Sequence, residues 1–279
     1  MTALVAEVVV GYLAARLAWL AARPLFAVPA LARHNYRGRA LPTGVGIVLP
    51  LAALVVEGGR AVAGSLGVGD VAGVGSVRGL VLVTALGFGL LGLVDDLAGG
   101  ADHGFRGHLG ALAQGRLTTG ALKLLGGGFL ALVVVAPFDG TSTVRLLADA
   151  ALVALSANLA NLLDRAPGRT LKAALGAFVV LVLASARADA LRATALMVGA
   201  ALGLLLDDLH ERLMLGDAGS NVLGAVLGLG VVVSCGPAAR DLALGVVLGL
   251  NVAGELVSFT RVIDAVPPLR ALDRAGRRP

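Results

Sequence analysis

The stretch Gly92-Leu93-Val94-Asp95-Asp96-Leu97 ends an apolar run, Gly79 to Val94, in two adjacent aspartates. A polar, Gly-rich segment follows, from Ala98 to Gly120. A charge near the middle of a membrane costs roughly 2.5–3.5 kcal/mol on insertion scales, and less toward the interface. The two carboxylates therefore mark either the point where a helix leaves the bilayer or a site for a divalent cation, since hard cations such as Mg²⁺ take carboxylate oxygens.

The same pattern recurs further along the chain. The apolar run Val144 to Leu163 ends in Asp164, and the run Leu191 to Leu206 ends in Asp207-Asp208. Three apolar segments thus finish in acids at their C-terminal ends. Whether these ends meet depends on the topology of the chain.

Composition places the chain among membrane proteins. It is 57% hydrophobic, contains 40 glycines and has a mean hydropathy of +0.89, which is typical of a polytopic α-helical membrane protein. We therefore predict an all-α membrane helix bundle that forms a single domain over residues 1–279. The single Cys235 excludes an internal disulfide and disfavours a metal–thiolate site. The net charge of +5 is explained by membrane orientation, so we expect no nucleic-acid partner.

About nine membrane segments are expected, each near the spanning length of about 20 residues or slightly short of it. With the N-terminus outside, fifteen Lys and Arg residues fall in inside loops and the C-terminal tail, against six in outside loops. Basic residues favour the cytoplasmic side, so the C-terminus and all three acidic ends are expected there. The predicted segments are 2–20, 41–56, 79–94, 121–136, 144–163, 171–186, 191–206, 222–235 and 240–260.

Polar residues near these acids are candidate ligands for a phosphate or a nucleotide. Lys123 lies one turn inside a membrane segment, so an acid or a phosphate should pair with it. The spacing of Asn158, Asn161 and Asp164 puts them along one helical stripe, which serves either as polar contact between helices or as a nucleotide or sugar site. Gly216-Asp217-Ala218-Gly219-Ser220-Asn221 offers a carboxylate and free N–H groups at a helix start, which suits a metal-bound diphosphate.

Four motifs, taken in order, resemble one enzyme family. Pro42-Thr43-Gly44, Gly92 to Asp96, Asn158 to Asp164 and Leu215 to Asn221 together look like the polyprenyl-phosphate N-acetylhexosamine-1-phosphate transferases. That superfamily includes phospho-N-acetylmuramoyl-pentapeptide transferase and the UDP-GlcNAc:undecaprenyl-phosphate transferases. The likeness runs from about Arg33 to Leu223.

The resemblance implies a reaction in a bacterial plasma membrane, with the active site on the cytoplasmic face. A polyprenyl phosphate attacks a UDP-amino sugar, and the products are UMP and a lipid-diphosphate sugar for cell-envelope polymers. Mg²⁺ is the implied cofactor, with Mn²⁺ as an alternative. The implied metal and catalytic residues are Asp217, Asp95 and Asp96, with Asp95 as a candidate general base and Lys123 as a phosphate contact. The implied substrate-binding residues are Thr43, Asn158, Asn161, Asp164 and Asp208. Arg106 and His108, in the loop after Asp96, are further candidates for substrate binding.

Several departures from the family leave the sugar and the nucleotide open. Arg165 stands where the family usually has Gly, and Met214 stands where the muramoyl-pentapeptide enzymes have an aromatic residue. We also expect the histidine-rich loop and the last helix of that family to be missing. The alternative is therefore a degenerate, non-catalytic member that binds a polyprenyl phosphate or a membrane partner. A homodimer through small residues such as Gly224, Gly228 and Gly230 is a further expectation.

Overall fold

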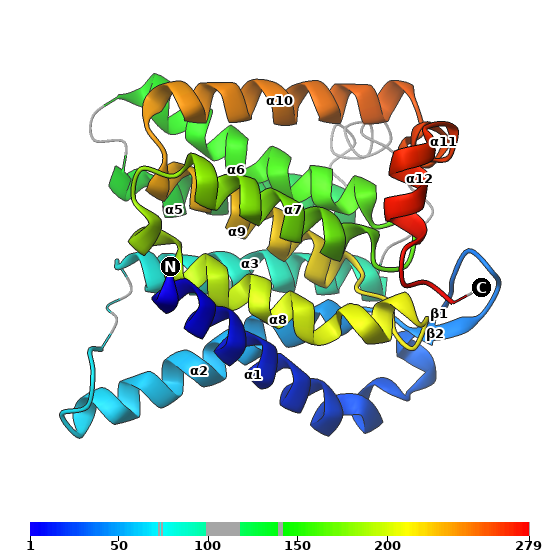
Figure 1. Cartoon of the computed structure of the whole chain (residues 1–279), viewed down its shortest axis with the longest axis horizontal. Coiled ribbons are helices and arrows are strands. Elements are labelled where there is room, and N and C mark those ends of the chain that lie inside the picture. The colour runs from blue at the N-terminus through cyan, green and yellow to red at the C-terminus, as the bar shows by residue number, and fades with distance from the viewer. Residues whose placement is uncertain (72, 74, 99–117, 139–141, 279) are drawn as a thin grey trace.

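Helix α9 (Asp217–Ser234) is the central element of the bundle (Figure 1). The computed structural model describes residues 1–71, 73, 75–98, 118–138 and 142–278. In α9, 83% of the residues are buried, more than in any other candidate membrane span of these ranges. The other α-helices of the described residues are α1 (Thr2–Phe26), α2 (Val48–Ser65), α3 (Val77–Ala98), α5 (Thr119–Val135), α6 (Thr143–Leu163), α7 (Arg169–Ala184), α8 (Arg192–Leu209), α10 (Pro237–Leu256), α11 (Phe259–Ala265) and α12 (Pro267–Arg274). Short 3₁₀ helices span Pro29–Leu31, Val45–Ile47, Ala136–Phe138 and Ala188–Leu191.

Small residues let α9 lie close to its neighbours. A Cβ atom at Gly224 would stand 2.1 Å from the carbonyl oxygen of Ser156 on α6, and one at Gly228 would stand 3.0 Å from the Cα of Val153. Close backbone approach of this kind is how membrane helices gain contact in the absence of a hydrophobic driving force. Gly224, Gly228 and Gly230 are all buried within the bundle, so they are not available as the dimer face that the sequence suggested.

The prediction of an all-α polytopic bundle is confirmed. Seven helices of the described ranges are long and apolar enough to cross a membrane, and α10 with α11 forms an eighth candidate, bent by 94°. Helix α7 coincides with a predicted segment but has only 16 residues, fewer than a membrane span needs. The count of nine spans and the orientation stay predictions.

One predicted segment begins in the wrong place. The sequence suggested an apolar helix over 41–56, but α2 begins only at Val48. Residues Ala32–His34 (β1) and Ala40–Pro42 (β2) instead form an antiparallel hairpin in which Arg33 pairs with Leu41. At the tip, the Asn35 side-chain oxygen accepts the backbone N–H groups of Arg37 and Arg39, both at 2.9 Å. These turn bonds fix the hairpin, which an all-helical reading of the sequence missed.

The C-terminal helices close one end of the bundle, the end at which the hairpin also lies (Figure 1). Arg169 at the start of α7 donates from Nε to Asp273 Oδ1 on α12 at 2.8 Å. Arg277 pairs with the same carboxylate at 2.6 Å, and Lys172 Nζ donates to the carbonyl oxygens of Leu272 and Ala275 at 2.9 and 3.2 Å. We call Arg169, Lys172, Asp273 and Arg277 the C-terminal latch, because they hold α12 against the start of α7.

Candidate active site

The end of α3 and the start of α9 meet at close quarters. A Cβ atom at Gly92 would stand 2.3 Å from the carbonyl oxygen of Asp217, so only glycine allows this approach. The contact brings Asp95 and Asp96 of α3 to the first residue of α9. Two of the acidic motifs that lie far apart in the sequence thus form one cluster.

The Asp96 side chain caps the N-terminus of α9. Its Oδ1 accepts the backbone N–H of Asp217 and its Oδ2 accepts the backbone N–H of Ala218, both at 3.0 Å. The first N–H groups of a helix have no partner within the helix, and a carboxylate there also interacts favourably with the helix dipole. Gly216, with φ of +71°, turns the chain so that these two groups face Asp96. Asp96 is therefore a helix cap supplied from another helix.

Asp95 points to a different partner. The ammonium group of Lys123 on α5 donates to Asp95 Oδ2 at 3.0 Å and to Asp217 Oδ2. The side chains of Lys123, Asp95 and Asp217 are 20%, 21% and 21% exposed, so solvent still reaches the cluster. The amide Nδ2 of Asn161 on α6 donates to the same Asp217 oxygen at 3.1 Å. Four helices thus contribute to one partly open cluster, which answers for these residues the question of convergence that the sequence left open.

The cluster has hard oxygen ligands for a divalent cation, but fewer than the sequence suggested. Among the described residues, no group of three or more His, Cys, Asp and Glu side chains is arranged to hold a metal ion. Both oxygens of Asp96 are taken by backbone N–H groups, so Asp96 does not fit a ligand role. Asp95 and Asp217 already share one cationic group, Lys123. They fit Mg²⁺, which binds through one or two carboxylates and keeps waters or substrate phosphates as its other ligands.

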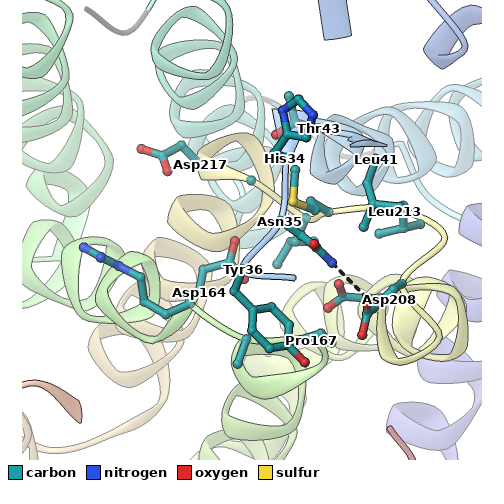
Figure 2. Close-up of a pocket in the computed structure, with 16 residues that line it drawn as sticks. His34, Asn35, Tyr36, Leu41, Thr43, Asp164, Pro167, Asp208, Leu213 and Asp217 are labelled. Atoms are coloured by element: carbon teal, nitrogen blue, oxygen red, sulfur yellow. Dashed lines mark hydrogen bonds between the residues drawn. The ribbon is translucent and has the colours of Figure 1, made fainter. Parts of the chain in front are cut away.

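A cavity of about 340 Å³ opens beside this cluster (Figure 2). The tip and second strand of the hairpin form one wall, the loop that leads into α9 forms another, and the turn between α6 and α7 forms a third. Its volume lies within the usual range for ligand pockets. The lining residues are His34, Asn35, Tyr36, Leu41, Thr43, Asp164, Arg165, Ala166, Pro167, Asp208, Glu211, Leu213, Met214, Leu215, Gly216 and Asp217.

Asp164 and Asp208 are two further acids in this lining (Figure 2). Asp208 Oδ2 accepts the backbone N–H of Gly168 at 2.9 Å, which fixes the turn before α7. Burial raises the pKa of the Asp164 carboxyl well above its ordinary value, and the charges of Asp208 and Asp217 raise it further. A carboxyl group that retains its proton can donate a hydrogen bond as well as accept one.

The other predicted site residues fall into three groups. Thr43 is buried and lines the cavity, and its role in substrate binding stays a prediction. Asn158 is not in the lining; its Nδ2 donates to Asn251 Oδ1 on α10 at 2.7 Å, which is the alternative role of polar contact between helices. Arg106 and His108 lie outside the described residues.

The hairpin supplies cavity residues that the sequence analysis did not single out. Asn35 Nδ2 donates to Glu211 Oε2 at 2.9 Å, which ties the hairpin tip to the loop before α9. Glu211 is also paired with Arg37 at 3.3 Å, and its backbone has a φ of +52°. Tyr36 lines this cavity and a second one of about 500 Å³, and Arg165 is likewise common to both. The Asn-Tyr-Arg-Gly-Arg run is rich in turn formers, a signal that was available in the sequence.

The fold and the spans define a class: the chain is a multi-pass α-helical membrane protein. No protein-family model matches the chain, and no curated protein matches it either.

Proposed function

We propose that this chain is a polyprenyl-phosphate N-acetylhexosamine-1-phosphate transferase in a bacterial plasma membrane. It would move a phospho-amino sugar from a UDP-sugar to a polyprenyl phosphate and release UMP, with its site on the cytoplasmic face. The observation that carries this proposal is the convergence of Asp95, Asp217 and Lys123, from three different helices, at the edge of a polar cavity. The type of reaction is inferred from the four sequence motifs that resemble the family.

The donor would occupy the cavity beside Asp217. A nucleotide suits a space of about 340 Å³ with polar groups on several walls, and the adjoining space of about 500 Å³ leaves room for the sugar. Met214 lines the cavity at the position where the related enzymes have an aromatic residue, but Tyr36 from the hairpin supplies an aromatic ring in the same lining. We propose that Tyr36 stacks on the base, while Asp164 or Asp208 hydrogen-bonds to it.

Phosphate transfer between two anions needs positive charge where the phosphates meet. Lys123 supplies part of that charge, and its ammonium group can move from a carboxylate to a phosphate oxygen without leaving the site. Asp95 and Asp217 would hold Mg²⁺, or Mn²⁺ in its place, and the bound ion would offset the charge of the diphosphate as a Lewis acid. Asp96 would keep α9 in register, so that Asp217 stays in position. A general base is not required, because a lipid phosphate is largely ionised at neutral pH.

The test is UMP release by purified protein with Mg²⁺, undecaprenyl phosphate and a panel of UDP-sugars. Asp217→Asn should abolish the release while the protein stays folded in detergent. Asp70→Asn is the matched control, because Asp70 is an exposed carboxylate in the loop before α3, at the opposite end of that helix from Asp95. Release that survives in Asp217→Asn would remove this residue from the site.

The alternative is a non-catalytic protein that binds polyprenyl phosphate or a membrane partner. The observation that favours it is that Lys123 already neutralises part of the charge of Asp95 and Asp217, so the repulsion between the two carboxylates is reduced without a metal. No UMP release with any donor, from a folded protein that still binds polyprenyl phosphate, would favour this function.

A further inference from the structure

A third cavity, lined by two arginines, lies at the C-terminal end of α1. It has a volume of about 330 Å³ and is lined by Trp19, Arg23, Ala27, Pro42 and Arg212. None of these five residues lines the cavity beside Asp217. Its chemistry is also opposite, because its charged side chains are arginines rather than acids.

The arginines of this cavity share a single buried carboxylate. Asp207 at the end of α8 is fully buried and pairs through Oδ1 with Arg23 at 3.4 Å and with Arg212 at 3.2 Å. Arg16, two turns before Arg23 on α1, pairs with the other oxygen. Three guanidinium groups thus face one carboxylate, which leaves an excess of positive charge and more N–H donors than the two oxygens can accept. Asp207 positions the arginines without neutralising them.

Arg23 and Arg212 remain accessible to a ligand. Their side chains are 43% and 50% exposed. The guanidinium carbon of Arg23 lies 5.4 Å from the centre of the Trp19 ring, and Trp19 itself is only 3% exposed. The ring therefore holds one arginine in place while part of its side chain stays exposed to a ligand. Two fixed arginines suit a phosphate, since a guanidinium binds phosphate oxygens through two parallel hydrogen bonds.

The position of the cavity favours a lipid as the source of that phosphate. Arg23 lies in the last turn of α1, which is a candidate membrane span, so the cavity lies near a boundary between water and hydrocarbon. Next to it in the sequence, Leu25 and Val28 are 71% and 43% exposed, and they offer apolar surface for acyl chains. Basic pockets between membrane helices are known to bind anionic head groups on the cytoplasmic side.

We propose that Arg23 and Arg212 form a binding site for the phosphate head group of an anionic glycerophospholipid. The site goes beyond the proposed transferase activity and does not depend on it, since the two cavities have no lining residue in common. A hydrogen bond from the Met214 N–H to the Pro42 carbonyl oxygen, at 2.8 Å, lies in the wall between them. A lipid in the basic cavity would therefore contact the segment that supports the hairpin.

The test is lipid binding to the purified full chain in neutral detergent, followed by native mass spectrometry and by titration. The probes are phosphatidylglycerol, phosphatidylcholine and inorganic phosphate. We expect the Arg23→Gln/Arg212→Gln double variant to bind phosphatidylglycerol at least about tenfold more weakly than the wild type, the loss expected for about 1.4 kcal/mol of binding energy. The control is Arg261→Gln/Arg270→Gln, which removes the same charge from exposed positions on α11 and α12. It should bind as the wild type does.

The outcomes separate the alternatives. Equal weakening in both double variants would mean that the overall charge of the protein attracts the lipid, and it would overturn the site. Inorganic phosphate that binds as tightly as phosphatidylglycerol and displaces it would overturn the lipid as the ligand. If the double variant does not fold, the single variant Arg212→Gln replaces it in the binding test. That side chain is half exposed, so its loss should disturb the fold less. Unchanged phosphatidylglycerol binding in this single variant would also overturn the proposal.

Discussion

The Asp96 carboxylate on α3 accepts the backbone N–H of Asp217, the first residue of α9, at 3.0 Å. This bond joins two motifs that are 121 residues apart in the sequence. It also separates the roles of two adjacent aspartates. Asp96 is occupied by the backbone of α9, whereas Asp95 faces the ammonium group of Lys123 and stays partly exposed.

Removal of the Asp96 carboxylate should therefore act mainly on the stability of the fold. Asp96→Ala leaves two N–H groups at the start of α9 without an acceptor, and we expect it to lower the free energy of unfolding by about 1–3 kcal/mol. Asp96→Asn should cost less, because its amide oxygen still accepts one of the two N–H groups. Thermal unfolding in detergent measures the difference. Equal melting temperatures for the wild type and Asp96→Ala would contradict the capping role.

Removal of the Lys123 charge should make stability depend on a divalent cation. Lys123→Met leaves Asp95 and Asp217 facing each other without a cation, at a cost of about 1–3 kcal/mol. Added Mg²⁺ can take the place of the ammonium group, so it should raise the melting temperature of this variant more than that of the wild type.

Lys172→Met is the matched control for that experiment. Lys172 donates to backbone carbonyl oxygens of the C-terminal latch, away from Asp95 and Asp217. Its loss should lower stability without creating a response to Mg²⁺. If Mg²⁺ stabilised both lysine variants to the same extent, the cluster around Lys123 would not be the binding site.

The two asparagines of α6 should behave differently. Asn158 bonds to Asn251 on α10, and a bond of this kind between membrane helices contributes about 0.6 kcal/mol, up to about 1.7. Asn158→Leu should therefore lower stability by that amount and leave UMP release unchanged. Asn161 bonds to Asp217, so Asn161→Leu should reduce UMP release with little change in melting temperature. Parallel measurement of activity and melting temperature checks both variants, and a loss of activity in Asn158→Leu alone would reverse the assignment.

The C-terminal latch should open in acid. Burial by itself raises the pKa of Asp273, but the hydrogen bond from Arg169 and the charges of Arg169 and Arg277 outweigh burial and hold that pKa below its ordinary value. Because the folded-state pKa is the lower one, the latch is fully stabilising above the unfolded value of about 3.9 and weakens as the pH falls through the folded value. Hydrogen exchange should thus show constant protection of α12 from pH 7 to pH 5 and a loss below about pH 4.

Two aspartate variants test whether the Asp273 carboxyl group causes this pH dependence. Asp273→Asn should reduce the protection of α12 at pH 7 and remove its dependence on pH. Asp264→Asn, at a half-exposed position near the same helix, should leave the pH profile as it is in the wild type. Full protection of α12 in Asp273→Asn at pH 7 would show that the ion pairs do not hold the helix.

The sequence predicted the helices well because long apolar runs bounded by acids and arginines have few other ways to fold in a membrane. The end of α6 at Leu163 and the Gly-Asp start of α9 could both be read from the order of residues, whereas α3 continues to Ala98, past the aspartates that end its apolar run. The pairing of Lys123 with an acid was expected for a similar reason, since an unpaired ammonium group in a membrane segment is costly.

Only the tertiary structure shows which partner each of the adjacent aspartates binds. Asp95 and Asp96 are neighbours in the sequence, but successive residues of a helix point about 100° apart, so they meet Lys123 and the start of α9 respectively. Asp207 and Asp208 divide in the same way, one toward the arginines of α1 and the other toward the turn before α7. These roles depend on partners that lie tens to hundreds of residues away. Only the packing of the helices specifies such partners, because the local pattern of apolar and polar residues carries no information about which distant group will face each side chain.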